Sequence, residues 1–289
     1  MILEPSHAVC SAGRPRLPAG TGHNLPAVLF VTWNVNSLRA RLPRVLGLLE
    51  QHQPDIVALQ ETKCSPANFP VAELELAGYD AVHHSGGQWA GVALLFRRPL
   101  APDMPLLGLP EDAIPSEARW CEATVAGTRV VSTYVPNGRS LDSPEYPRKL
   151  AFLEAAAKRA AAIRVVADGT SLVIAGDMNV APADADVYDP AVYVGATHAS
   201  EPERAALAAI QERGDLVDAY RYVHPDEQQF TWWDYRAGNF HKNLGMRIDL
   251  ALVSSGLAEG LIACGIDRDF RKGFKPSDHA PLLVWMGLG

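Results

Sequence analysis

Residues 172-LVIAGDMNVAP-182 join an apolar run to a polar turn, and the rest of the chain can be interpreted outward from them. The run 172-LVIAG-176 has the composition of a buried strand, and we expect that strand to break at Gly176. Asp177 and Asn179 follow, and on an extended chain their side chains would point to the same side. Because aspartate and asparagine are also frequent in turns, an ordinary turn explains the motif equally well when it is taken alone.

Similar apolar runs recur along the chain and alternate with helical segments. We expect further strands at 28–33, 56–59, 92–96, 129–135, 248–253 and 281–285. We expect helices at 39–52, 147–163 and 202–214, with Pro147 at the start of the second and Gly214 as the C-cap of the third. This alternation predicts an α/β fold in which sheets pack face to face with helices outside.

The chain shows no internal linker or repeat, so we expect residues 27–289 to form a single domain. Residues 1–26 are rich in proline, glycine and small polar residues and are expected to form a flexible N-terminal extension. No run approaches the roughly 20 apolar residues of a membrane span, so a membrane protein is not expected. The reducing cytoplasm is the expected compartment, because the four cysteines are far apart and suggest neither a zinc site nor a disulfide framework: Cys10, Cys64, Cys121 and Cys264.

The net charge of −7 argues against nucleic acid as a partner, since DNA binding depends on Lys and Arg that neutralise phosphates. The objection weakens if carboxylates belong to a metal site, because a bound divalent cation offsets them. Without four candidate carboxylates the net charge would be −3 instead of −7: Glu61, Asp177, Asp249 and Asp278. Bulk charge therefore does not decide between the function classes.

Polar residues lie inside or at the tips of the apolar runs, and ligand sites on sheets collect at such strand ends. They are Asn34, Glu61, Tyr134, Asp177, Asn179, Asp249, Asp278 and His279. Taken singly, Glu61 could be a solvated strand end, and Asn34 could be a helix N-cap or turn residue, as could Asn36 or Ser37. Asp249 is harder to explain in this way, because a charge within an apolar strand is costly unless it is paired.

Together these side chains match the needs of phosphodiester hydrolysis, which are a cation on the phosphoryl oxygens, a group that orients water, and stabilisation of the leaving oxygen. Glu61 could hold the cation and Asp177 the water. Asp249 and His279 could form a couple for the phosphoryl group, with a carboxylate oxygen about 3 Å from a ring nitrogen. The sequence has no Walker A loop, H-E-x-x-H or G-x-S-x-G motif.

Seven segments, in this order, resemble the exonuclease III family of apurinic/apyrimidinic endonucleases, within the wider endonuclease/exonuclease/phosphatase superfamily. They are TWNVNSLRAR, LQETK, YVPNG, GDMNVAP, FTWWDYR, LGMRIDLALVS and KPSDHAP. The resemblance implies a four-layered α/β sandwich with two mixed β-sheets. It also implies that Mg²⁺ is the cofactor, with Mn²⁺ as a substitute.

The resemblance further implies a role for each matching residue. Asn34 and Glu61 would hold the metal, with Asp278 as a further ligand. Asp177 would orient or activate the attacking water, or assist the leaving group. Asn179, Tyr134 and His279 would contact the scissile phosphate. Asp249 would orient His279.

The substrate implied by the resemblance is double-stranded DNA with abasic sites or 3′ ends, bound by a monomer. In 230-FTWWDYR-236, Trp232 matches the family's sugar-pocket position and Trp233 is the expected packing residue. An aromatic ring that stacks on a base contributes about 1–3 kcal/mol. Contacts to the DNA backbone are expected from Arg39, Arg119, Arg236 and Lys275.

Two rival functions remain open from the sequence. A phosphatase or phospholipase of the same superfamily would share the GD-x-N and SDH chemistry, but it should lack the W-x-D-Y-R insertion. A catalytically inactive DNA-binding member would not need so many desolvated charges. Residues 183–204 lie near the expected site, and differences there could determine whether abasic-site incision or 3′ exonuclease action dominates.

Overall fold

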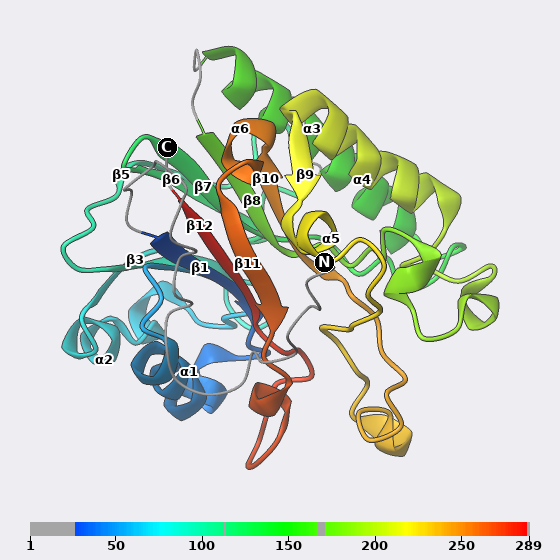
Figure 1. The fold of residues 1–289 in the computed structure, drawn as a ribbon, viewed down its shortest axis with the longest axis horizontal. Coiled ribbons are helices and arrows are strands. Elements are labelled where there is room, and N and C mark those ends of the chain that lie inside the picture. The colour runs from blue at the N-terminus through cyan, green and yellow to red at the C-terminus, as the bar shows by residue number, and fades with distance from the viewer. Residues whose placement is uncertain (1–26, 113, 167–170, 288–289) are drawn as a thin grey trace, which may run out of the picture.

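The computed structural model describes residues 27–112, 114–166 and 171–287, and shows two six-stranded sheets packed face to face (Figure 1). The strand order of the first sheet is β11 (Leu261–Ile266), β12 (Leu282–Gly287), β1 (Ala27–Asn34), β2 (Ile56–Gln60), β4 (Val92–Arg97) and β3 (Tyr79–His84). The order of the second is β5 (Asp103–Leu107), β6 (Trp120–Val125), β7 (Thr128–Tyr134), β8 (Ser171–Asp177), β10 (Asp249–Ser254) and β9 (Leu216–Asp218).

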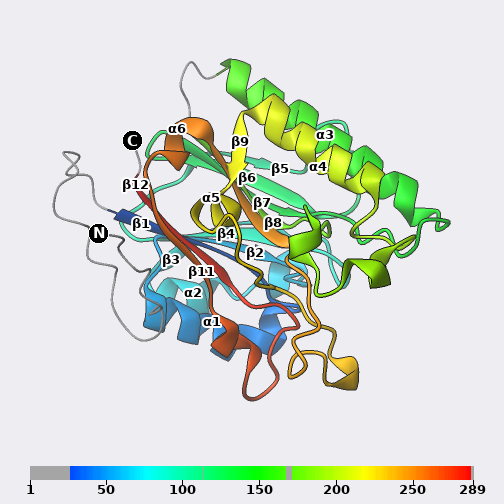
Figure 2. The ribbon, with the colours of Figure 1, turned by 45° about the vertical axis from the view of Figure 1, so that its right-hand side comes forward.

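Both sheets are mixed. The pairs β1–β2 and β7–β8 are parallel, and the other strand pairs are antiparallel. The helices are α1 (Leu38–His52), α2 (Val71–Leu76), α3 (Glu145–Val166), α4 (Glu201–Gly214), α5 (Ala219–Val223) and α6 (Ser255–Ala258). Figure 2 shows α1 and α2 against the outer face of the first sheet, and α3 and α4 side by side over the second. The predicted four-layered sandwich is thus confirmed.

Three apolar clusters hold these layers together. One lies between the two sheets and contains Phe30, Phe96 and Val253. The other two join each sheet to its helices, through Leu48 of α1 on one side and Phe152 of α3 on the other. Burial of a single large apolar side chain of this kind contributes about 1.5–3 kcal/mol, so the sandwich core is the main source of stability.

All the strands and helices expected from the sequence are present, but two local expectations were wrong. The strand β8 does not break at Gly176, because Gly176 pairs with both neighbouring strands and the strand continues to Asp177. A Cβ at Gly176 would lie 1.9 Å from the carbonyl oxygen of Thr133, so only glycine fits there. The C-cap of α4 is Asp215, with φ 53°, and Gly214 is the last helical residue.

The predicted N-terminal extension, residues 1–26, lies outside the described residues, as does Cys10. The three described cysteines are buried and free. Within the described ranges, no helix has the length and apolar character that crossing a membrane would require.

Candidate active site

The candidate site lies where strand ends of the two sheets meet. Because β7 and β8 are parallel and β10 is antiparallel to β8, the strand register places Tyr134, Asp177 and Asp249 side by side at one edge of the second sheet. Asn34 ends β1 and Glu61 directly follows β2, so the first sheet contributes these two side chains. Strand register aligns the residues within the second sheet, and the packing of the two sheets brings Asn34 and Glu61 next to them.

Asn34 links the two sheets through its side-chain amide. Its Nδ2 donates to Glu61 Oε1 at 2.8 Å and to Asp177 Oδ2 at 2.9 Å, and its Oδ1 accepts from the backbone N–H of Asn36 at 3.0 Å. The amide nitrogen of Asn34 therefore donates to both carboxylates and lies between them. Lys63 contributes a positive charge next to Glu61, since its Nζ lies 2.6 Å from Glu61 Oε2. Of the three residues considered as the cap of α1, Ser37 holds the N-cap position, so Asn34 is not the cap.

The predicted couple of Asp249 and His279 is present. Asp249 Oδ2 lies 2.8 Å from His279 Nδ1, and His279 Nε2 faces Asp177 Oδ2 at 3.8 Å. Burial alone would lower the pKa of His279, but the carboxylates of Asp249 and Asp177 outweigh it and raise that pKa to about 10. The imidazole is therefore held in its protonated, doubly donating form.

Asp177 is buried, and its pKa is raised as well. Burial raises the pKa of Asp177 to about 7, an effect opposed by the His279 charge and reinforced by Asp249 and Glu61. A carboxyl group poised near neutral pH can exchange a proton with water or with a leaving oxygen. One side-chain atom each of Glu61, Asp177 and His279 lies within 4.8 Å of the others, and of these three the two carboxylates can hold a cation, while the protonated His279 can only donate beside it.

Backbone strain is concentrated around the same residues. Six non-glycine residues near the site have left-handed φ values between 45° and 89°: Asn36, Ser37, Glu61, Lys63, Asn179 and His198. Each such residue costs about 1–3 kcal/mol unless the surrounding structure compensates, and such strain clusters at functional sites.

Comparisons with known proteins agree with this geometry. The model of the endonuclease/exonuclease/phosphatase family matches residues 31–279. The chain belongs to that family. It is 33% identical over 266 residues to exodeoxyribonuclease III of Haemophilus influenzae, covering 88% of this chain and 97% of the relative.

Two solved structures are similar over 90% of this chain and the whole of theirs. One is an AP endonuclease from Archaeoglobus fulgidus, with a TM-score of 0.85 and 35% identity. The other is a 3′ phosphatase from Neisseria bound to a product DNA hairpin, with a TM-score of 0.86 and 38% identity. The resemblance to exonuclease III-type enzymes is therefore confirmed, and the protein is a hydrolase of this family.

Asn179 differs from the extended geometry expected from the sequence. Its φ of 50° turns the chain directly after β8, and its backbone N–H donates to Asp177 Oδ1 at 2.9 Å, so the turn interpretation was correct. Its side chain donates to the carbonyl of Val135 at 2.9 Å and lies 3.1 Å from His198 Nε2. Asn179 is thereby fixed beside Asp177.

Tyr134 reaches the cluster from β7. Burial, followed by the carboxylates of Glu61 and Asp177, raises the pKa of Tyr134 well above its usual value, so the hydroxyl stays neutral and can donate. The guanidinium of Arg119 lies 4.6 Å from the centre of the Tyr134 ring and 2.5 Å from Glu117 Oε2. Arg119, expected to contact DNA, therefore also supports Tyr134.

Asp278 does not belong to the group formed by Glu61, Asp177 and His279. Its Oδ1 accepts from Asn36 Nδ2 at 3.0 Å, and its Oδ2 accepts from Trp232 Nε1 at 3.2 Å. Asp278 thus connects the turn before α1 to the aromatic insertion. Its role as a metal ligand remains a prediction.

The other residues expected to touch DNA differ in how far they are exposed. Trp233 is fully buried, as expected for the packing residue, whereas Trp232 is only partly buried. Arg39 and Lys275 are exposed, and Arg236 is exposed but forms an ion pair of 2.7 Å with Asp234.

Several residues near the site were not assigned a role from the sequence. Lys63 and Asn36 belong to the quoted motifs LQETK and TWNVN, and they contact each other at 2.7 Å. His198 lies within the 183–204 segment, and burial, followed by the nearby charge of Lys149, lowers its pKa to about 3. His198 is therefore neutral beside Asn179.

A buried ion pair lies beneath these loops. Lys149 of α3 donates to Glu203 of α4 at 2.5 Å and to the backbone carbonyl of Asn179 at 2.6 Å, and neither Lys149 nor Glu203 is exposed. Glu203 also accepts from Thr197 Oγ1 at 2.7 Å and from the backbone N–H of His198 at 3.0 Å. The pair therefore ties both outer helices to the site.

Proposed function

We propose that this protein is a Mg²⁺-dependent DNA repair nuclease that hydrolyses phosphodiesters at abasic sites or at 3′ ends of double-stranded DNA. The observation that carries the proposal is the chain of contacts from Asp249 through His279 to Asp177, linked by Asn34 to Glu61. The names of the similar proteins, an exodeoxyribonuclease III, an AP endonuclease and a DNA-bound 3′ phosphatase, support DNA as the substrate.

The proposed roles follow from the geometry of each side chain. His279 donates from Nε2 to a phosphoryl oxygen, while Asp249 holds Nδ1 and fixes the ring. Asp177 orients the attacking water or returns a proton to the leaving oxygen, which its pKa of about 7 favours. Tyr134 and Asn179 supply neutral donors toward the oxyanion.

The residues present suit a hard divalent cation, which prefers oxygen ligands. Glu61 and Asp177 offer carboxylate oxygens close together, and the Asp249 carboxylate keeps one buried oxygen without a hydrogen-bond partner nearby. Mg²⁺, or Mn²⁺ in its place, would be held by Glu61 with Asn34 and Asp278 adjacent, and would supply positive charge at the phosphoryl oxygens.

Two further parts of the proposal concern the state of the protein. We propose that it acts as a monomer, which is supported by every proposed site residue coming from one chain. We also propose a reducing compartment such as the cytoplasm, supported by the free, dispersed cysteines of the described ranges.

The test compares two DNA duplexes, one with an internal abasic analogue and one with a recessed 3′ end. Each is incubated with Mg²⁺ and, separately, with a chelator. Nicking of the first duplex identifies an abasic endonuclease, and shortening of the second identifies a 3′ exonuclease. If neither duplex is altered with Mg²⁺ present, while an inositol phosphate or a phospholipid is hydrolysed, the proposal is wrong.

A further inference from the structure

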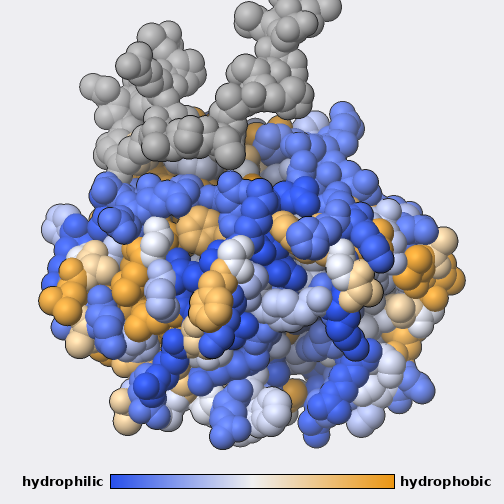
Figure 3. Space-filling view, turned by 90° about the horizontal axis from the view of Figure 1, so that it is seen from below, coloured by the Kyte–Doolittle hydropathy of each residue, from blue (hydrophilic) through white to orange (hydrophobic). Residues whose placement is uncertain are grey.

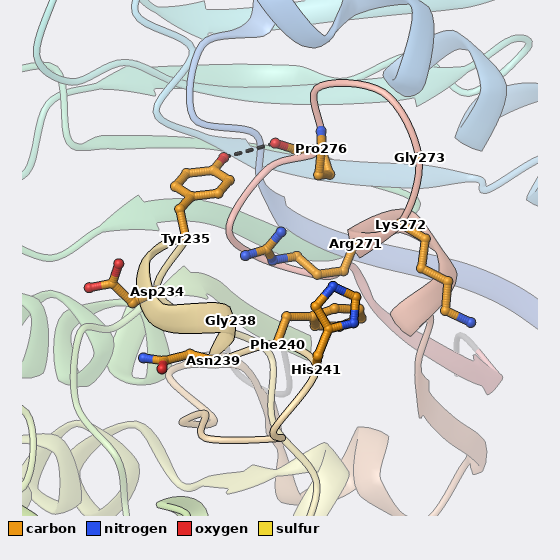
Figure 4. Close-up of a pocket in the computed structure, with 10 residues that line it drawn as sticks. All are labelled: Asp234, Tyr235, Gly238, Asn239, Phe240, His241, Arg271, Lys272, Gly273 and Pro276. Atoms are coloured by element: carbon orange, nitrogen blue, oxygen red, sulfur yellow. Dashed lines mark hydrogen bonds between the residues drawn. The ribbon is translucent and has the colours of Figure 1, made fainter.

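A cluster of basic residues lies around a hollow of about 280 Å³. The hollow is lined by two loops, and Figure 4 shows its lining residues, among them Asp234, Tyr235, Asn239, Phe240, Arg271 and Lys272. We name it the arginine hollow, because Arg271 lines it and Arg268 stacks on its wall, 5.4 Å from the centre of the Phe240 ring. Segment 271–279 connects the hollow to the catalytic histidine.

Arginines elsewhere in the described chain mostly form ion pairs. Arg213 lies 2.8 Å from Glu154, and Arg247 lies 2.7 Å from Asp218. At the hollow the pattern changes, since among the described residues no carboxylate lies within 4.0 Å of the guanidinium of Arg41, Arg44, Arg268 or Arg271. Lys272 and Asp234, the other charged lining residues, are paired with Asp269 and Arg236.

These arginines contact only neutral groups. Arg271 is 6% exposed, and donates to the backbone carbonyls of Asp278 at 3.1 Å and Trp233 at 2.9 Å. Figure 4 shows its guanidinium directed toward the Tyr235 ring, whose centre is 4.8 Å away. For Arg268, which stacks on Trp233 and Phe240, the described residues offer no hydrogen-bond acceptor.

The second pair of arginines comes from α1. Arg44 donates to the carbonyl of Phe270 at 2.6 Å, and Arg41 donates to the hydroxyl of Tyr235 at 3.2 Å. The Nε atoms of both are buried without a hydrogen-bond partner among the described residues. Burial lowers the pKa of Arg44 and of Arg268 with no neighbouring anion to oppose it, and it lowers the pKa of Arg271 although Tyr235 and the carboxylates of Asp278 and Asp234 oppose the shift.

Uncompensated cations that are partly buried are costly, and a bound anion would offset that cost. We infer that the arginine hollow receives a backbone phosphate of the DNA that flanks the cleavage point. This inference rests on the proposed nuclease function. Arg271 holds the carbonyl of Asp278, next to His279, so a phosphate in the hollow would fix the register of the strand relative to the catalytic histidine.

The surrounding surface suits a polyanion. The loops of the hollow project downward in Figure 1, and the face viewed from below in Figure 3 is mainly hydrophilic, with apolar side chains in separate patches. A chain with a net charge of −7 needs local positive charge to bind DNA, and unpaired arginines at one place provide it.

The experiment measures DNA affinity against salt concentration for wild type, Arg268→Gln and a matched control, Arg213→Gln. Arg213 undergoes the same charge change at the end of α4, where it is paired with Glu154. Fluorescence anisotropy with a labelled duplex, in chelator, gives Kd between about 50 and 200 mM salt. Steady-state kinetics with Mg²⁺ give kcat at saturating DNA.

For Arg268→Gln we expect the slope of log affinity against log salt to become shallower by about 0.9, the value of one phosphate contact. Affinity should fall about tenfold at low salt, and the control should match wild type. A slope and Kd equal to those of the control would overturn the inference. A flat salt profile in the wild type would instead contradict the proposed nuclease function itself.

A second variant covers the case in which Arg268→Gln does not fold. Asn239→Asp places a carboxylate among the lining residues with almost no change of shape. If the hollow binds phosphate, DNA affinity should fall at least tenfold while Tm is unchanged or higher. If the arginines serve only to pack the aromatic insertion, Tm should rise with no change in affinity, and the inference is wrong.

Discussion

Replacing Glu203 by glutamine should destabilise the protein far more than an ordinary loss of a carboxylate. The substitution leaves the Lys149 ammonium fully buried, with only neutral partners such as the carbonyl of Asn179 at 2.6 Å. Removing one member of a buried ion pair costs about 3–5 kcal/mol. With about 2–4 °C per kcal/mol for a domain of this size, Tm should fall by roughly 10 °C.

The destabilisation should also depend on pH in a defined direction. Burial lowers the pKa of Lys149 below its ordinary 10.5 even when Glu203 opposes this effect, and the variant lacks that opposition. The folded variant then releases the lysine proton more readily than the unfolded chain, so its free energy of unfolding should increase as pH rises from 7 toward 10.

Chemical denaturation at several pH values measures both effects, with Glu212→Gln as the exposed control on the same helix, expected to change stability by less than about 0.5 kcal/mol. The double variant Lys149→Met/Glu203→Gln removes both charges and should be more stable than Glu203→Gln alone. If Glu203→Gln costs under about 1 kcal/mol, or if the double variant is the less stable of the two, the pair does not act as a buried charge couple.

Three further predictions concern catalysis. Asp177→Asn should lower kcat by about 10²–10⁴ while DNA affinity in chelator is retained, and a wild-type rate would remove Asp177 from its proposed role. Asp249→Asn should lower kcat similarly, and ring NMR in chelator should show a lower pKa of His279, since Asp249 raises it; an unchanged pKa would contradict the couple. Chelator should abolish turnover and Mg²⁺ should restore it, whereas Glu61→Gln should shift the Mg²⁺ dependence to higher concentration.

The sequence was most informative where strands are buried on both faces. The runs that became β2, β4 and β8 are apolar along almost their whole length, and each lies inside a sheet. The strands that were not foreseen at the sheet edges lack that signal, because β3, β5 and β11 keep most of their side chains accessible and β9 has only three residues. The unforeseen inner strand β6 contains Glu122, whose charge interrupts the apolar pattern and is compensated by Arg129 and Arg159.

For the site, the sequence predicted residue types and one contact but not the surrounding network. The cost of a charge inside an apolar strand indicated that Asp249 is paired, the family resemblance indicated His279 as its partner, and their distance of 2.8 Å agrees. The pair of Lys149 and Glu203 had no comparable signal, since its members are 54 residues apart on two helices. The left-handed backbone conformation of Glu61 and Asn179 could not be predicted from the sequence either, because neither position is a glycine.

The net charge illustrates why composition could not decide the function. The net charge of −7 argued against DNA binding, because it was counted over the whole chain. In the structure, arginines away from the site are neutralised by carboxylates, as in the pair of Arg213 and Glu154. Arg268 and Arg271, near the site, form no ion pair among the described residues, so charge is distributed unevenly over the molecule. Affinity for a polyanion depends on this local field within about 8–10 Å, the screening length of physiological salt, and not on the total charge.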